Sequence, residues 1–284
     1  MTSVAVVGLG AMGSRIARRF LDAGNELVIW NRDPARATPL TEAGATRAET
    51  PAEAARTAEV IVTMVADPQA LRAVTEGPDG VAAGASDSTT VVQMSTVGPD
   101  SISRLASVLP SAGGLLDSPV LGSVSEAESG TLKVFLSGEP PLVERLTPLL
   151  SALGAVLHVG TLGAGTAAKL VANSTLVGTI SLLGESLALA GKLGLSRDVT
   201  FDVLAVTALA AQAERRRAAI ETGDYPKRFG LSLARKDADL ILEAAAAAGA
   251  DLRLLAAART WFTDAEEAGR GDDDYSAVLG EIVR

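Results

Sequence analysis

Short runs rich in Val, Ile and Leu recur through the first 160 residues and alternate with longer stretches of helical periodicity. The runs expected to form strands are Val4–Val7, Leu27–Trp30, Val60–Val65, Val91–Met94, Leu115–Leu116, Lys133–Leu136 and Val156–Val159. Such alternation is typical of a mostly parallel sheet that carries helices on its faces. We therefore predict a doubly wound, Rossmann-like α/β domain over residues 1–162.

After Gly165 the strand-like runs stop, and the chain becomes rich in Ala and Leu at helical spacing. This change of pattern predicts a second, all-helical domain over residues 163–284. Its first helix is expected to run from about Thr166 to Leu193, roughly 40 Å at about 1.5 Å per residue. Apolar residues occupy nearly every side of this helix, which is typical of an interdomain or dimer-core helix covered from several directions.

The composition excludes several classes of function. A net charge of −9 disfavours a nucleic-acid-binding surface, which requires clustered positive charge. The chain has no cysteine and one histidine, so we expect no metal site. A strand-like run begins at Val4, which leaves no room for a signal peptide, and polar residues interrupt the longest apolar stretch, so we expect a cytoplasmic protein without a membrane span.

A glycine-rich motif follows the first predicted strand directly. It reads Gly8-Leu9-Gly10-Ala11-Met12-Gly13, and a helical stretch from Ser14 to Ala23 continues it. In a G-x-G-x-x-G turn the first glycine permits the tight turn, the second lets backbone approach a pyrophosphate, and the third allows close packing of helix on strand. The motif in this setting predicts a dinucleotide-binding site.

The residues after the second predicted strand bear on the choice of cofactor. Asn31 and Arg32 occupy the place where NAD enzymes usually carry an acid for the ribose 2′-hydroxyl. A guanidinium suits a 2′-phosphate, so NADP (NADPH) is favoured over NAD. Two alternatives stay open: Arg32 could be a solvated loop charge, or Asp33 could take the acidic role if the strand ends later.

Several further motifs lie in order along the chain. They are Met94-Ser95-Thr96-Val97, Asp117-Ser118-Pro119-Val120 through Gly130-Thr131-Leu132, Gly163-x-Gly165-x3-Lys169-x3-Asn173, Phe229-x6-Lys236-Asp237 and Asp273-Asp274-Tyr275-Ser276-Ala277. Together with the glycine motif they make the chain resemble the β-hydroxyacid dehydrogenase family, most of all its NADPH-dependent glyoxylate and succinic semialdehyde reductase branch. The resemblance spans almost the whole chain.

This resemblance implies a Rossmann-like domain, a helical domain, a homodimer or homotetramer, and a substrate that is a small carbonyl compound or hydroxy acid. It implies Lys169 as the catalytic residue, with Asn173 as its partner in holding the substrate. The cofactor residues would be Gly8, Leu9, Gly10, Ala11, Met12, Gly13, Asn31, Arg32, Val65, Ala66, Thr96 and Lys236. The substrate would meet Thr96, Leu121, Gly122, Ser123, Lys169, Asn173, Phe229 and Asp237.

The spacing of Lys169 and Asn173 suits this role. Residues four apart project from one side of a helix, so both side chains can reach one small ligand. Reduction of a carbonyl needs a hydride and a proton, and a lysine can donate the proton if burial lowers its pKa toward the working pH. Asn173 can hydrogen-bond the substrate without changing its charge.

One position departs from the family. The family commonly has serine where this chain has Leu121, and that hydroxyl helps to bind the substrate carboxylate. The small residues from Pro119 to Ser123 would still let backbone amides approach an anionic group. A leucine cannot donate that hydrogen bond, so we expect weak use of glyoxylate and better use of a larger or less polar carbonyl compound.

Other interpretations stay open at this point. Lys236 and Asp237 could belong to a solvated helix surface, and Phe229 could be a core residue. Leu121 slightly favours an imine reductase on a related scaffold, although Lys169 argues against it, and the chain is too short for a 6-phosphogluconate dehydrogenase. A non-catalytic NADP-binding module is a further alternative. The physiological substrate, the direction of reaction and the number of subunits are not specified by the sequence.

Overall fold

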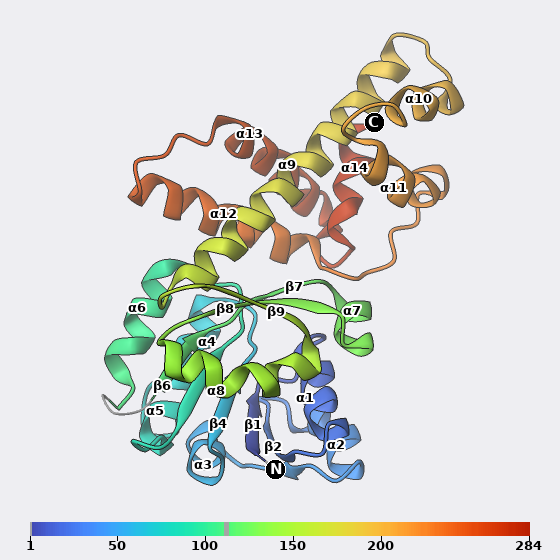
Figure 1. Ribbon diagram of the computed structural model, residues 1–284. Coiled ribbons are helices and arrows are strands. Elements are labelled where there is room, and N and C mark those ends of the chain that lie inside the picture. Colours follow the sequence, from blue (N-terminus) through green and yellow to red (C-terminus); the bar gives the residue numbers. More distant parts are fainter. Residues whose placement is uncertain (1, 111–113) are drawn as a thin grey trace. The chain divides into compact units, whose positions relative to one another are not determined.

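The computed structural model describes residues 2–110 and 114–284. The chain divides into two compact units, Met1–Lys169 and Leu170–Arg284. The boundary predicted at residues 162 and 163 lies slightly before this division, at the start of the longest helix (Figure 1).

The strands in the described part of the first unit form one sheet. They are β1 Ser3–Val7, β2 Glu26–Trp30, β3 Thr46–Arg47, β4 Val60–Thr63, β5 Thr90–Gln93, β6 Gly114–Asp117, β7 Val120–Leu121, β8 Leu132–Ser137 and β9 Gly154–Gly160. Their order is β3-β2-β1-β4-β5-β6-β8-β7, with β9 also paired to β8. The strands β1 to β6 are parallel, and β8 runs antiparallel to β6 and β7. The predicted doubly wound, mostly parallel sheet is therefore confirmed.

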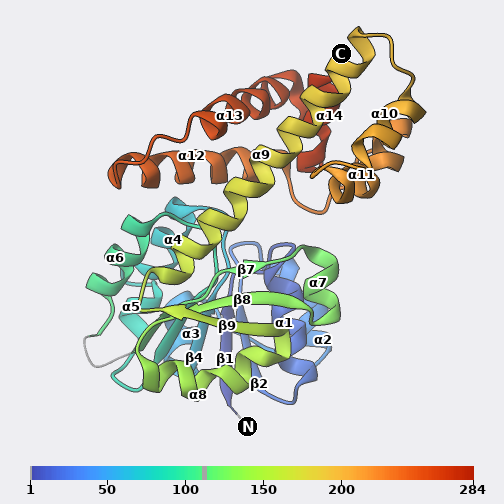
Figure 2. The ribbon, with the colours of Figure 1, turned by 45° about the horizontal axis from the view of Figure 1, so that its top comes forward.

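Helices cover both faces of this sheet (Figure 2). They are α1 Gly13–Asp22, α2 Thr38–Glu42, α3 Pro51–Thr57, α4 Pro68–Thr75, α5 Val81–Gly84, α6 Pro99–Val108, α7 Val124–Ser129 and α8 Pro140–Leu150. Successive strand residues point to opposite faces. Val4 and Val6 of β1 thus join the core under α1 and α8, while Ala5 and Val7 join the core under α3, α4 and α6. Burial on both faces explains why the strands read as continuous apolar runs.

The second unit is helical, as predicted. It contains most of α9 Ala164–Lys192, and then α10 Arg197–Leu204, α11 Ala210–Thr222, α12 Leu231–Ala247, α13 Arg253–Ala265 and α14 Val278–Ile282. Helices α12 and α13 pack side by side (Figure 2). Helix α9 is long and apolar enough to cross a bilayer by length and composition, but its buried residues Val177, Ile180 and Leu183 join the core of this unit.

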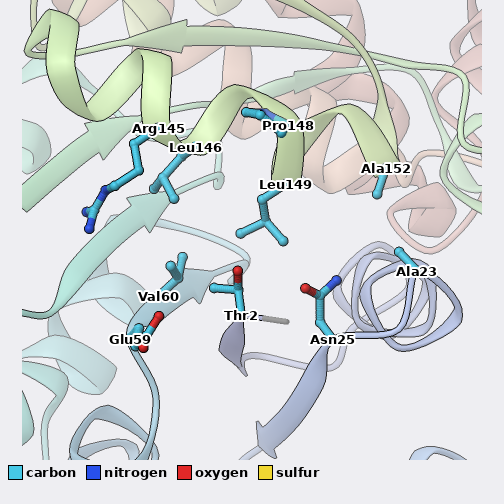
Figure 3. Close-up of a pocket in the computed structure, with 10 residues that line it drawn as sticks. All are labelled: Thr2, Ala23, Asn25, Glu59, Val60, Arg145, Leu146, Pro148, Leu149 and Ala152. Atoms are coloured by element: carbon cyan, nitrogen blue, oxygen red, sulfur yellow. The ribbon is translucent and has the colours of Figure 1, made fainter.

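A cavity of about 330 Å³ lies at the amino ends of the strands. Leu146 and Leu149 of α8 face Val60 and Thr2 across it (Figure 3). Ligands of doubly wound sheets bind at the carboxyl ends of the strands. This cavity is therefore at the edge opposite to the glycine motif and is not the expected dinucleotide site.

Candidate active site

The glycine motif forms the turn between β1 and α1. Gly8 has φ of +104°, and a Cβ there would lie 2.3 Å from the carbonyl oxygen of Met64. A Cβ at Gly13 would lie 1.9 Å from the carbonyl oxygen of Gly8, whereas a Cβ at Gly10 would meet no atom within 4 Å. Gly8 and Gly13 are thus required by the protein's own packing, and Gly10 borders open space.

The start of α1 fits a dinucleotide pyrophosphate. Within residues 2–110 and 114–284, the backbone N–H groups of Gly10, Ala11 and Met12 donate no hydrogen bond to the protein. Unpaired amides at the start of a helix are the usual binding site of phosphate oxygens, because the helix dipole adds positive potential there. Leu9 differs, because its amide donates to Oδ1 of Asn31 at 2.9 Å and so holds Asn31 beside the turn.

Asn31, Arg32 and Asp33 follow β2, which ends at Trp30 as predicted. The carboxylate of Asp33 accepts from the amide of Ala35 at 3.1 Å and caps a short 3₁₀ helix, Pro34–Ala37. Arg32 is exposed next to it. The strand therefore ends at the expected residue. It does not extend further, as the alternative with Asp33 in the acidic position required.

Val65, Ala66 and Thr96 follow the carboxyl ends of β4 and β5, at the same edge of the sheet as the glycine motif. Strand β4 ends at Thr63, two residues before the predicted end at Val65. The hydroxyl of Ser95 joins the two segments by accepting from the amide of Val65 at 2.8 Å. The structure thus brings all the predicted cofactor residues of the first unit to one edge.

Leu121, Gly122 and Ser123 lead from β7 into α7. Leu121 is half-buried and pairs with Lys133 of β8 in the sheet. The amide and hydroxyl of Ser123 both donate to Oε2 of Glu126, each at 2.7 Å. The expectation that this segment offers free amides to an anionic group is therefore not met at Ser123, because a carboxylate of the protein already binds there.

The pKa of Glu126 is lowered to about 2, chiefly by the hydrogen bond from the Ser123 hydroxyl and next by that from the Ser123 amide. The hydroxyl of Ser125 also donates to Oε2, at 3.1 Å. Glu126 thus carries a full negative charge beside the predicted substrate segment at any working pH.

The first turn of α9 is fixed to the sheet. The amide of Gly165 donates to the hydroxyl of Ser137 at 2.9 Å, and the amide of Thr166 donates to Oδ2 of Asp117 at 2.6 Å. A Cβ at Gly165 would lie 2.5 Å from the carbonyl oxygen of Asp117. Lys169, which is buried, lies one turn further along. The Gly163-x-Gly165 motif therefore allows α9 to begin against β6 and β8 and sets the place of Lys169.

Asp117 is fully buried and also accepts from the hydroxyl of Thr166 at 2.9 Å. Burial raises its pKa from 3.8 to about 6, although the bonds from Thr166 oppose this shift. Asp117 is therefore a helix cap whose charge state changes near neutral pH.

In the second unit, Asn173 and Asp237 meet. Nδ2 of Asn173 on α9 donates to Oδ2 of Asp237 on α12 at 2.6 Å, and both residues are 2% exposed. Nζ of Lys236 lies 2.8 Å from Oδ1 of Asp237. The alternative of a solvated helix surface is thus wrong for Asp237, which faces the interior and holds the amide of Asn173. Lys236 beside it is half-buried.

Phe229 lies just before α12 and is half-buried against the core of the second unit. Its ring centroid is 5.8 Å from that of Tyr275, and its amide donates to Oδ2 of Asp274 at 3.1 Å. Arg216 in turn lies 3.6 Å from Oδ1 of Asp274. The Asp274-Tyr275 motif thus fixes the segment that carries Phe229.

Family models match nearly the whole chain in two stretches. Residues 3–163 match the NAD binding domain of 6-phosphogluconate dehydrogenase, and residues 163–282 match the NAD-binding domain of NADP-dependent 3-hydroxyisobutyrate dehydrogenase. The chain is 33% identical over 287 residues to 3-sulfolactaldehyde reductase of Escherichia coli strain K12, covering 99% of this chain and 96% of that relative. The chain belongs to the β-hydroxyacid dehydrogenase family.

Two further relatives agree with this membership of the β-hydroxyacid dehydrogenases. Glyoxylate/succinic semialdehyde reductase 2 of Arabidopsis thaliana is 31% identical over 98% of this chain and 78% of its own length. The structure of 3-hydroxyisobutyrate dehydrogenase from Mycobacterium tuberculosis with L-serine matches with a TM-score of 0.90 and 28% identity over 100% of both chains. The chain is accordingly an NAD(P)-dependent oxidoreductase that acts on substrates of the carbonyl and β-hydroxyacid type.

An imine reductase from Pseudomonas shares the fold, with a TM-score of 0.63 and 24% identity. This likeness shows the fold alone, and neither an imine reductase nor a non-catalytic module is favoured for this β-hydroxyacid dehydrogenase.

Sequence reasoning missed three residues around the predicted site. Asp117 appeared in a motif without a role, because its partner Thr166 is 49 residues away in sequence. Ser137 accepts from the amide of Gly165, which is 28 residues away in sequence. Glu126 could have been found, since Ser123-x-x-Glu126 is the spacing of a helix capping box.

Proposed function

We propose that this chain reduces a small carbonyl compound with NADPH, with Lys169 as the proton donor. The observation that carries the proposal is the placement of Lys169 on α9. Lys169 is a buried residue one turn after a helix start that Asp117, Ser137 and Gly165 fix to the sheet. A proton donor must be held in one position to act on one atom of a substrate.

The chain's own residues have separable roles in this proposal. When bound, the reduced nicotinamide supplies the hydride. Lys169 protonates the carbonyl oxygen during reduction and takes the proton back when an alcohol is oxidised. Asn173 lies one turn later on α9, and its Nδ2 is held by Asp237, so its carbonyl oxygen is left to accept from the substrate hydroxyl. The amides of Gly10, Ala11 and Met12 would hold the pyrophosphate.

The preference for NADPH rests on Arg32. This residue is exposed two positions after β2, and the neighbouring Asp33 is engaged as a cap. A guanidinium binds a 2′-phosphate in a bidentate manner, and an acid in that place would repel it. We also propose a cytoplasmic protein that assembles as a homodimer or homotetramer.

The experiment follows NADPH absorbance against a panel of aldehydes, keto acids and cyclic imines, with NADH in parallel. We expect activity with at least one aldehyde or keto acid, and higher kcat/KM with NADPH. Lys169→Ala should lower kcat by about 10³-fold, in the range of a lost general acid, and leave the dissociation constant of NADPH unchanged.

The matched control is Lys192→Ala, which removes an exposed lysine from the other end of the same helix. Its kcat should equal that of the wild type. Near-normal turnover by Lys169→Ala on a confirmed substrate would refute the role of Lys169.

A further inference from the structure

Ser95 is a fully buried residue whose hydroxyl joins two loops at the carboxyl edge of the sheet. The hydroxyl accepts from the amide of Val65 at 2.8 Å and donates to the carbonyl oxygen of Thr63 at 3.5 Å. Thr63 is the last residue of β4, and Val65 follows it, whereas Ser95 follows β5. The place of the segment after β4 therefore depends on one side chain from the neighbouring strand.

Gln93 in turn holds the backbone of Ser95. The side-chain amide of Gln93 donates to the carbonyl oxygen of Ser95 at 2.9 Å, and its Oε1 accepts from the amide of Ser95 at 2.5 Å. Gln93 is the last residue of β5 and is fully buried. Polar groups that are satisfied in this way within a core are rigid. The hydroxyl of Ser95 is therefore held in one position.

The segment that Ser95 holds lies against the glycine motif. A Cβ built on Gly8 would lie 3.0 Å from Cγ1 of Val65 and 2.3 Å from the carbonyl oxygen of Met64. Gly8 opens the turn whose amides we assign to the pyrophosphate of the dinucleotide. A shift of Met64 and Val65 would therefore change the wall of the dinucleotide site.

We infer that Ser95 is a positioning residue, which holds Val65 and Ala66 in the place where the bound dinucleotide meets them. The inference rests on the proposed function, because it takes Val65 and Ala66 as cofactor contacts. It goes beyond that function, because Ser95 acts on the dinucleotide only through the amide of Val65. A protein that has this segment in place for only part of the time binds its ligand more weakly in proportion to that fraction.

Ser95→Ala tests the inference, because it leaves the amide of Val65 without this acceptor. Calorimetry measures the Kd of NADPH or NADH, whichever the wild type binds more tightly, without any reaction. We expect this Kd to rise about tenfold, the effect of one lost hydrogen bond. The kcat at saturating dinucleotide should equal that of the wild type, because other residues hold Lys169. Ser95→Cys keeps the size of the side chain and a weaker acceptor, so it should raise the Kd by a smaller factor.

Ser137→Ala is the matched control at the same edge of the sheet. The hydroxyl of Ser137 also accepts from a backbone amide, that of Gly165, and donates to a backbone carbonyl, that of Asp117. It holds the start of α9, so this variant should lower kcat and leave the Kd of the dinucleotide unchanged. Thr75→Val removes a buried hydroxyl of α4 that donates to the carbonyl oxygen of Leu71 at 2.7 Å, and it should change neither constant.

The binding measurement separates this inference from the proposed function. A higher Kd in Ser95→Ala but not in Ser137→Ala supports the inference, whereas an unchanged Kd in Ser95→Ala, or an equal rise in both variants, overturns it. If Lys169→Ala turns over normally or NADH is preferred, the proposed function fails, and the Kd values still decide on Ser95. If Ser95→Ala does not fold, Ser95→Cys gives the same comparison.

Discussion

Asp117 is a buried carboxylate whose titration should be visible in the stability of the protein. Its pKa is raised from 3.8 to about 6, mainly by burial. The folded protein therefore binds more protons than the unfolded chain between these values. The contribution of this group is complete below about pH 4 and is lost as the pH rises through 6. The loss amounts to about 3 kcal/mol at most.

Asp117→Asn tests this prediction, because Asn can accept from the amide of Thr166 and donate to its hydroxyl while it carries no charge. We expect the free energy of unfolding of the wild type to fall relative to the variant by about 2–3 kcal/mol between pH 4 and pH 7. Urea unfolding followed by Trp30 fluorescence measures it, with Trp261→Phe in both proteins so that Trp30 reports alone. If the free energies of unfolding of the two proteins changed in parallel with pH, Asp117 would not titrate in this range.

At the residue scale, the sequence predicted those site residues that stand at recognisable motif positions. Lys169 and Asn173 were expected from the family resemblance, with which their spacing agrees, and the structure has both residues buried on α9. Asp237 was expected to contact the substrate, but its hydrogen bond with Asn173 and the capping role of Asp117 could not be predicted in the same way. Each depends on a partner about 50 or more residues away, which becomes a neighbour only after folding.

At the scale of elements, α9 begins in close contact with the strands of the sheet. In Gly165→Ala, the new Cβ would lie 2.5 and 2.7 Å from the carbonyl oxygens of Asp117 and Phe135. The helix must move away from the sheet, so we expect a loss of about 1–3 kcal/mol in the free energy of unfolding. Because Lys169 moves with the helix, kcat should fall while the KM for NADPH changes little.

Gly191→Ala is the control for this substitution. It lies near the end of the same helix, is exposed, and its Cβ would meet no atom within 4 Å. Alanine is the better helix former by about 0.5–1 kcal/mol, so this variant should be as stable as the wild type or more stable. Chemical denaturation and steady-state kinetics of both variants measure the contrast. Equal effects at the two glycines would contradict the tight packing of Gly165.

The predicted elements show what hydrophobic pattern can and cannot specify. The seven apolar runs all correspond to strands. For central strands such as β1, β4 and β5, burial on both faces leaves a continuous apolar signal. Strands β3 and β7 were missed. Each has two residues, too few for a period to appear, and each exists because a neighbouring strand offers free hydrogen-bonding groups.

At the scale of the whole molecule, composition and change of pattern were sufficient to predict an α/β unit followed by a helical one. The exact division was harder to predict, because α9 is continuous across it. Its first residues pack on β6 and β8, and later ones such as Val177 and Leu183 pack in the helical core. Because one helix packs in both units, no turn residue marks the boundary between them in the sequence.

Exposed apolar residues on α9 lead to a prediction about how copies of this chain assemble. Val171, Leu182 and Leu189 recur at intervals of 11 and 7 residues on one side of α9, and they are 66%, 46% and 60% exposed. Apolar side chains gathered on a surface commonly mark a contact with another chain. We therefore expect sedimentation to give a species of at least twice 28.9 kDa.

Leu189→Glu would place a charge in that contact and should yield a monomer at micromolar concentration. Leu157→Glu is the matched control, because Leu157 of β9 is 56% exposed in the other unit. If Leu157→Glu gave a monomer and Leu189→Glu did not, the contact between subunits would not lie on α9.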